Sequence, residues 1–265
     1  MNSAVNAIYD NGVLHEWQRL DTSVAHLEFC TTLHLIQKYF PKTGHVADIG
    51  GGPGRYTVEL LKQGYQVTLV DLSEKAVAFA KTKCDELKLQ PERIIQGDAR
   101  DLSWLETDTF DAVLLMGPLY HVRQNQDRHH ILEDLKRILK PDGVALVAYM
   151  NAWGVMRSSL TNHPDRFSNL DMAHSMLDTF EEGVWYYSTP PIALAEIRSV
   201  GLEILSYAGA EGFVGGGGMK PILAHLAESN PLAYDNVVHL AVETCELPQY
   251  RDTTDHLHII SQKSC

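Results

Sequence analysis

Five short apolar runs, separated by segments with helical spacing, constrain the fold of this chain more than any other feature. They are residues 45–49, 66–70, 94–95, 110–116 and 144–150. Strands that alternate with helices of about 10–15 residues imply βαβ units and a parallel sheet. Nearly continuous apolar strands are expected where helices cover both faces of that sheet. The sequence therefore predicts an α/β fold, with Ser73 as the N-cap of one of its helices.

The two ends of the chain do not follow this alternation of strands and helices. The N-terminal residues read as helical, with Asp21-Thr22 as a cap and Phe29, Leu33, Ile36 and Phe40 on one face. After Met150 the segment 151–187 has no clean period, whereas the remainder returns to helices and ends in an alternating strand. We expect one domain over 1–265, divided into residues 1–44 (helical), 45–150 (alternating), 151–187 (inserted) and 188–265 (remaining helices and strands).

Composition limits the partners and the compartment. Lys plus Arg total 22 and Asp plus Glu total 34, so the net charge is −12, which disfavours a nucleic acid or an anionic membrane as partner. Four cysteines without a CxxC pair indicate a reduced protein. No signal peptide is visible and no run approaches the roughly 18 apolar residues of a membrane span. The expected location is cytoplasmic, with no metal site, since His256 and His258 lack a third ligand.

The segment from Val46 to Leu60, VADIGGGPGRYTVEL, reads as a strand, a glycine turn and a helix. Such a turn brings backbone N–H groups close to a ligand. The dinucleotide pattern G-x-G-x-x-G fails, because Arg55 or Thr57 stands at its third glycine. Asp71, 21 residues after Gly50, ends the second strand and suits ribose hydroxyls. Asp98 follows the third strand, where it could accept a hydrogen bond from an adenine amine.

Together with VTLVDLS, QGDARDL, FDAVLLMGPLYH and LKPDGVALVAYM, this segment resembles the class I S-adenosylmethionine-dependent methyltransferases over about residues 45–150. The resemblance implies a Rossmann-like, seven-stranded, mostly parallel sheet with helices on both faces, a helical N-terminal lid and an inserted cap. It also implies S-adenosylmethionine as cofactor. A binding protein without methyl transfer and a nicotinamide-dependent oxidoreductase are the alternatives.

The resemblance also implies a set of cofactor-binding residues. The lid would contribute Tyr9 and Arg19, the latter pairing with the cofactor carboxylate, although a solvated helix packed through its aromatic residues is an equal alternative. The methionine part would lie between Asp48, the glycine turn and Met116, and the nucleoside against the next two strand ends. The remaining members are Gly50, Gly51, Gly52 and Gly54 of the turn, Asp71 and Leu72, and Asp98 and Ala99.

The acceptor side is less determined. His121 follows the fourth strand and is the candidate general base, with a structural role as the alternative. Gly117-Pro118-Leu119-Tyr120 departs from the Asn/Asp-Pro-Pro-aromatic pattern of methyltransferases that act on nucleic-acid bases, which favours a small-molecule acceptor. Candidate substrate-binding residues are Tyr120 and, in the cap, Trp153, Arg157, Trp185 and Tyr186. The oligomeric state stays open.

Overall fold

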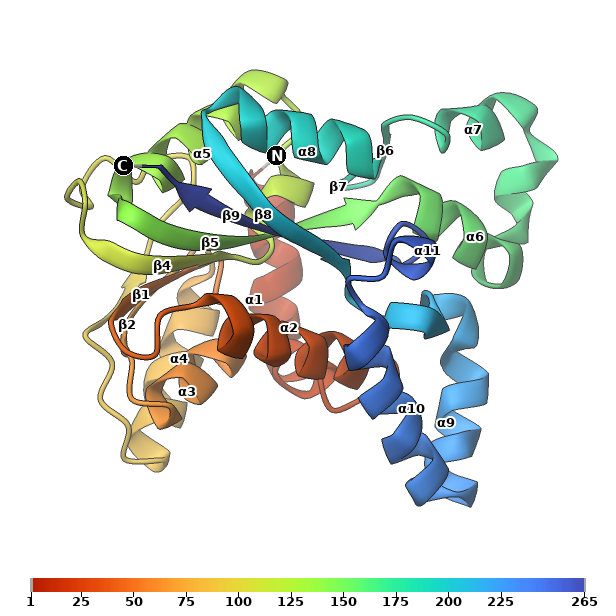
Figure 1. Ribbon diagram of the computed structural model, residues 1–265, viewed down its shortest axis with the longest axis horizontal. Helices are drawn as coiled ribbons and strands as arrows, with labels where there is room; N and C mark the ends of the chain where they lie inside the picture. The colour runs from red at the N-terminus through yellow and green to blue at the C-terminus, as the bar shows by residue number, and fades with distance from the viewer. Residues whose placement is uncertain (1, 265) are drawn as a thin grey trace.

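The computed structural model, which describes residues 2–264, is built around a nine-stranded mixed sheet (Figure 1). Its parallel strands stand in the order β3-β2-β1-β4-β5, and the antiparallel strand β9 lies between β5 and β8. The strands are β1 (His45–Ile49), β2 (Gln66–Asp71), β3 (Arg93–Gln96), β4 (Phe110–Leu115), β5 (Leu139–Asn151), β6 (Phe180–Glu182), β7 (Trp185–Ser188), β8 (Leu202–Gly209) and β9 (His256–Lys263).

The α/β class and the mostly parallel sheet are confirmed, but the sheet has nine strands instead of the expected seven. The order β3-β2-β1-β4-β5-β9-β8 supplies seven of them. The other two form the β6–β7 ribbon, which is antiparallel within itself and pairs with β5 through Met150 and Asn151. This pairing exists because β5 continues beyond its neighbour β4, whose register with it stops at Val147, so its end offers unpaired backbone groups.

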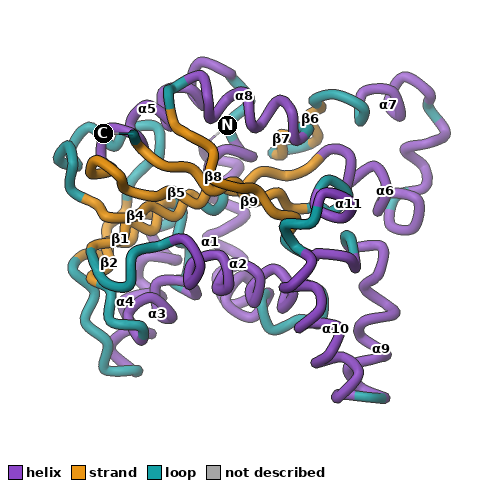
Figure 2. Tube along the Cα trace, viewed as in Figure 1, coloured by secondary structure: helices purple, strands orange, loops and turns teal. Residues whose placement is uncertain are grey.

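Helices cover both faces of the sheet, and Figure 2 shows the strands enclosed between two helical layers. On one face Ala47 and Ile49 pack in a core cluster that includes α5 and α8, and on the other Val46 packs in a cluster that includes α2 and α3. This alternation follows from the two-residue period of a strand. The helices on the sheet are α2 (Ala25–Tyr39), α3 (Arg55–Lys62), α4 (Glu74–Glu86), α5 (Asn125–Ile138) and α8 (Pro190–Ser199).

The remaining helices surround this core. The longer ones are α1 (Asn2–Arg19), α6 (Ala152–Asn162), α9 (Lys220–Ser229) and α10 (Pro231–Thr244). The short ones are η1 (Pro118–His121), η2 (Pro164–Ser168), α7 (Leu170–Ser175), η3 (Gly212–Val214), η4 (Gly217–Met219) and α11 (Pro248–Arg251). Within the described residues, no helix is both long and apolar enough to cross a membrane.

The capping predictions had different outcomes. Ser73 caps α4, since its Oγ accepts a hydrogen bond from the Ala76 N–H at 3.0 Å. Asp21-Thr22 does not cap α2, which follows Val24 without a side-chain cap. Asp21 pairs with Arg55 at 2.8 Å instead, and the Thr22 hydroxyl donates to the carbonyl of Arg19. The prediction was wrong because both side chains are used in the turn between α1 and α2.

Residues 151–187 form α6, η2, α7, β6 and most of β7, and they lie at one end of the sheet in Figure 1. They carry a small apolar cluster of their own, in which Met176 is fully buried and the rings of Phe180 and Tyr187 stack at 4.2 Å. The segment therefore packs beside the carboxyl end of β5. Among the described cysteines, Cys30, Cys84 and Cys245 are free thiols, and Cys265 lies outside the described residues.

Candidate active site

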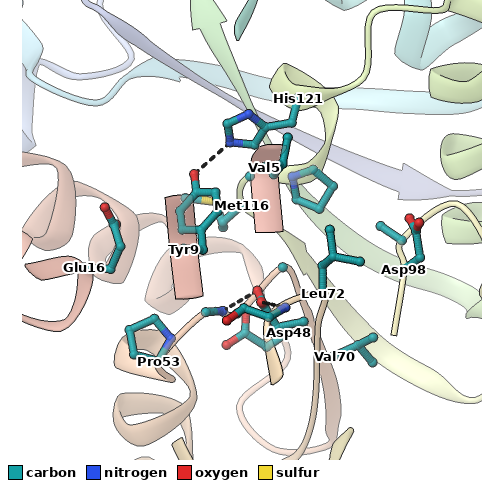
Figure 3. Close-up of a pocket in the computed structure, with 18 of the residues that line it drawn as sticks. Val5, Tyr9, Glu16, Asp48, Pro53, Val70, Leu72, Asp98, Met116 and His121 are labelled. Atoms are coloured by element: carbon teal, nitrogen blue, oxygen red, sulfur yellow. Dashed lines mark hydrogen bonds between the residues drawn. The ribbon is translucent and has the colours of Figure 1, made fainter. Parts of the chain in front are cut away.

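A cavity opens at the carboxyl ends of β1, β2 and β4, and α1 forms one of its walls (Figure 3). In an open α/β sheet this edge is where ligands bind, because neighbouring loops diverge there. The lining comes from α1, the glycine turn, the ends of β2 and β3, and the segment after β4. The predicted site residues that line the cavity are Tyr9, Arg19, Asp48, Gly50, Gly51, Gly52, Asp71, Leu72, Asp98, Ala99, Met116, Tyr120 and His121.

The glycine turn follows strand β1, and Gly50 and Gly51 have no room for a side chain. Gly50 has a φ of +76°, its N–H donates to the carbonyl of Val70 at 2.7 Å, and a Cβ there would lie 2.5 Å from Cδ of Pro118. A side chain would therefore clash and strain the backbone. Gly54 stands apart: it is the N-cap of α3, and its missing Cβ allows the close approach of Ala80 instead of lining the cavity.

Asp71 at the end of β2 is held by backbone donors. Its Oδ2 accepts from the Gly52 N–H and its Oδ1 accepts from the Ser73 N–H, both at 2.8 Å. Burial raises the pKa of this carboxyl group, and the two backbone hydrogen bonds oppose that effect. Each oxygen can still accept a further hydrogen bond, because an ionised carboxylate has about four lone-pair sites. The group is thus oriented to accept from two hydroxyls.

Asp48 on β1 is fully buried, and one of its oxygens lacks a partner. Oδ2 accepts from the Thr57 hydroxyl at 2.6 Å, whereas Oδ1 has no hydrogen-bond partner among the described residues. Burial raises the pKa of Asp48 to about 6. A buried polar atom without a partner is costly, so this oxygen, in a residue of the cavity wall, suits a ligand that donates a hydrogen bond or carries positive charge.

The side of the cavity next to β3 combines apolar and charged groups. Leu72, Ala99 and Val70 contribute apolar surface. Asp98 is held by Arg100, whose Nη2 lies 2.6 Å from its Oδ2. Sequence reasoning did not include Arg100 in the site, although it stands in the same QGDARDL motif.

Helix α1 contributes both polar and apolar groups to the wall. Val5, Tyr9 and Glu16 lie on one of its faces, as a spacing of 3.6 residues per turn requires, and Leu20 directly follows the helix. Arg19 donates to Glu16 at 3.1 Å and to Glu28 at 2.8 Å and 3.4 Å, which uses three of its five N–H groups. Only Tyr9 and Arg19 were predicted; the helical period would have identified Val5 and Glu16.

His121 in η1 is held at both ring nitrogens. Nε2 lies 2.7 Å from the hydroxyl of Tyr9, and Nδ1 lies 3.1 Å from the carbonyl of Val184. Its ring also packs against Tyr120 and Trp185, with centroid separations of 5.0 Å and 4.5 Å. Burial lowers the pKa of His121, which favours the neutral ring.

The predicted cap residues have other surroundings. Trp185 reaches the site indirectly, by stacking on Tyr120 and packing against His121. In the described chain, no residue of 151–187 lines the cavity. Trp153 donates to the carbonyl of Leu177, and the Arg157 guanidinium lies against Gly215. Tyr186 accepts from Arg128 at 3.1 Å, and its ring lies 3.8 Å from that guanidinium.

These groups fit S-adenosylmethionine as the resemblance implied it. Asp71 offers oriented oxygens for two ribose hydroxyls, and the unpartnered Oδ1 of Asp48 suits an ammonium group or a nearby positive charge. Leu72 and Ala99 offer apolar surface for a base. The carboxylate oxygens and the apolar side chains that match the cofactor all belong to this chain.

Comparison with known proteins agrees with this architecture. Residues 46–143 match a family model described as a methyltransferase domain. The Bacillus subtilis protein YqeM, which its name groups with the methyltransferases, is 28% identical over 127 residues. That match spans 48% of this chain and 50% of that protein, so about half of each. The tRNA 5-carboxymethoxyuridine methyltransferase of Escherichia coli is 23% identical over 251 residues, which are 93% of this chain and 86% of that enzyme.

A solved structure with a similar fold covers nearly the whole chain. It is the 1,6-didemethyltoxoflavin-N1-methyltransferase of Burkholderia thailandensis with bound 1,6-didemethyltoxoflavin and S-adenosylhomocysteine. The TM-score is 0.61 at 14% identity, covering 99% of this chain and 88% of that one. The matches to methyltransferases argue against the alternative of a nicotinamide-dependent oxidoreductase.

Proposed function

We propose that this chain is a class I S-adenosylmethionine-dependent methyltransferase that methylates an O, N, S or C atom of a small molecule. The cofactor supplies a methyl group that its positively charged sulfur has already activated. The protein has to align the acceptor with that methyl group and exclude water, so positioning provides much of the rate. Thirteen predicted residues line the cavity. We assign cofactor binding to eleven of them, all except Tyr120 and His121, together with Gly54 as the support of the glycine turn.

The electrostatics of the cavity carry the preference for a small acceptor. Three arginines line it, and each pairs with carboxylates of this chain: Arg19 with Glu16 and Glu28, Arg55 with Asp21, and Arg100 with Asp98. Binding of a polyanion draws much of its affinity from cations that neutralise phosphates. Because these cations are already neutralised and the net charge is −12, the cavity suits an uncharged or cationic acceptor better than a nucleic acid.

A tRNA nucleotide is the second candidate. The observation that favours it is the E. coli relative, whose name gives tRNA as its substrate and whose match covers 93% of this chain. At 23% identity the two chains can differ in acceptor. In this reading, the cation pairs at the cavity would have to open when the tRNA backbone approaches, and methylation would weaken steeply with salt.

One labelling experiment separates the two candidates. Purified protein is incubated with S-adenosylmethionine carrying a tritiated methyl group, together with either unfractionated bacterial tRNA or a metabolite extract freed of macromolecules. We expect label in the metabolite fraction. Label only in tRNA would establish the second candidate, and no label in either fraction would contradict methyl transfer by this chain.

Cofactor binding is tested separately by calorimetry. Asp71→Ala should weaken S-adenosylmethionine and S-adenosylhomocysteine alike by roughly tenfold or more, about 1.4 kcal/mol, because both ligands carry the ribose. Asp85→Ala, at an exposed position of α4, is the control for loss of one negative charge. Equal affinities in the two variants would contradict the role of Asp71.

A further inference from the structure

The hydrogen bonds of His121 determine which of its ring nitrogens carries the proton. Nδ1 lies 3.1 Å from the carbonyl oxygen of Val184, which can only accept. Nδ1 must therefore be the N–H donor. Because the buried ring is neutral, Nε2 has a lone pair and accepts. The hydroxyl of Tyr9, 2.7 Å away, consequently donates its proton to Nε2.

This arrangement leaves Nε2 of His121 already occupied. The Tyr9 hydroxyl, in contrast, donates its proton to this hydrogen bond, and its oxygen lone pairs can accept a hydrogen bond from an incoming group. Both residues line the cavity, and Figure 3 shows the two side chains joined by this hydrogen bond next to Met116. An acceptor O–H or N–H group that enters the cavity meets a hydroxyl oxygen that histidine has polarised.

On this basis, and resting on the proposed methyl transfer, we propose that Tyr9 Oη takes the acceptor's proton and that His121 Nε2 receives the proton that Tyr9 gives up. The acceptor's X–H bond breaks as a new O–H bond forms on Tyr9, and the former Tyr9 O–H bond breaks as an N–H bond forms on His121. The acceptor's electron pair forms the bond to the methyl carbon, and the pair of the broken carbon–sulfur bond stays on sulfur. The step therefore moves one positive charge from sulfur to the imidazole ring.

The groups around Tyr9 favour a relay over a stored tyrosinate. Burial raises the pKa of Tyr9 well above its usual value, and Tyr120, Glu16 and Asp71 act in the same direction, whereas Arg19 opposes them. Tyr9 thus stays a neutral hydroxyl between turnovers. The consequence is that α1 supplies an atom that contacts the acceptor, so the N-terminal helix is part of the catalytic machinery as well as a wall.

The tautomer can be tested without any acceptor. The full-length protein with ¹⁵N-labelled histidine is studied by NMR, and His121→Ala identifies the resonances of that ring. We expect a protonated Nδ1 and an unprotonated Nε2 whose resonance moves when Tyr9→Phe removes the hydroxyl. Tyr65→Phe, which removes a hydroxyl bonded to Pro41, should leave it unchanged. A protonated Nε2 in the wild type, or an Nε2 resonance indifferent to Tyr9→Phe, would overturn the proposal.

The activity arm uses the metabolite fraction and tritiated cofactor described above. At a cofactor concentration that saturates each protein, set from its own measured affinity, Tyr9→Phe should lower the initial rate by at least about tenfold. A wild-type rate in Tyr9→Phe would refute the relay. If the wild type itself transfers no label to the metabolites, the small-molecule function fails, and the NMR result alone then decides the tautomer.

Discussion

Asp48→Asn tests whether burial of this carboxyl group acts as the structure indicates. The carboxyl group is fully buried on strand β1, and burial raises its pKa from 3.8 to about 6. Asparagine keeps a carbonyl oxygen for the Thr57 hydroxyl, which donates to Asp48 at 2.6 Å. It removes the ionisation and leaves the volume nearly unchanged.

The magnitude follows from linkage between proton binding and folding. Because the folded-state pKa is raised, the contribution of Asp48 to stability is fully present below pH 3.8 and is lost as the pH rises through about 6. Each pKa unit corresponds to about 1.4 kcal/mol, so the ionised group costs the folded state about 3 kcal/mol at neutral pH. About half of this loss accrues between roughly pH 5 and pH 7.5.

The assay is urea unfolding of the wild type and of Asp48→Asn at several pH values between roughly 5 and 7.5, without ligand. The difference in unfolding free energy should grow in favour of the variant by about 1.5 kcal/mol across this range. A constant offset from the new amide does not affect that slope. Asp85→Asn, at an exposed position, shows what the loss of one charge does by itself.

Parallel curves for the wild type and Asp48→Asn would refute the reasoning. They would mean that Asp48 ionises in the folded protein as easily as in the unfolded one, so that water or a cation reaches Oδ1. The same conclusion would follow if the unfolding free energy of Asp48→Asn, relative to wild type, changed with pH no more than that of Asp85→Asn.

Two further substitutions test other parts of the structure. Gly50→Ala, whose Cβ would lie 2.5 Å from Cδ of Pro118 at a φ of +76°, should reduce affinity for S-adenosylhomocysteine at least tenfold by calorimetry, roughly 1.4 kcal/mol. Gly64→Ala, with a φ of +90° and nothing within 4 Å, should only lower stability by about 1 kcal/mol, and equal affinity losses would contradict this. Although burial lowers the pKa of His256, Glu28 and a hydrogen bond to Glu211 raise it to about 9. Its stabilisation should therefore be complete below about pH 6.5 and lost as the pH rises through about 9, and His256→Gln should flatten that decline in urea unfolding; an unchanged decline would argue against it.

The residues that line the cavity at the strand ends were predictable because their signals are local. The glycine turn, Asp71 and Asp98 each stand directly after an apolar run, and the carboxyl ends of parallel strands meet at one edge of the sheet. The class of fold followed from the same alternation. What the sequence did not reveal was the pairing of Arg19 with Glu28, because the turn between α1 and α2 that brings them together has no distinctive signal.

The acceptor side was less predictable, and the strand period explains one failure. Trp185 and Tyr186 were both expected in one pocket, but neighbouring residues of a strand point to opposite faces. Trp185 packs against His121, and Tyr186 contacts Arg128 on the other side. Had 185–188 been recognised as a strand, only one of the two aromatic residues would have been assigned to the site.

The β6–β7 ribbon has a consequence for protein engineering. The family match ends at residue 143, whereas the carbonyl that orients His121 belongs to Val184, between the two strands of the ribbon. Arg123 adds a second link, since it pairs with Glu181 at 3.1 Å. A chimera that receives residues 151–187 from another methyltransferase would therefore keep His121 but lose Val184, whose carbonyl orients it. Residues 120–123 and the ribbon should be exchanged as one unit when the acceptor preference is to be transplanted.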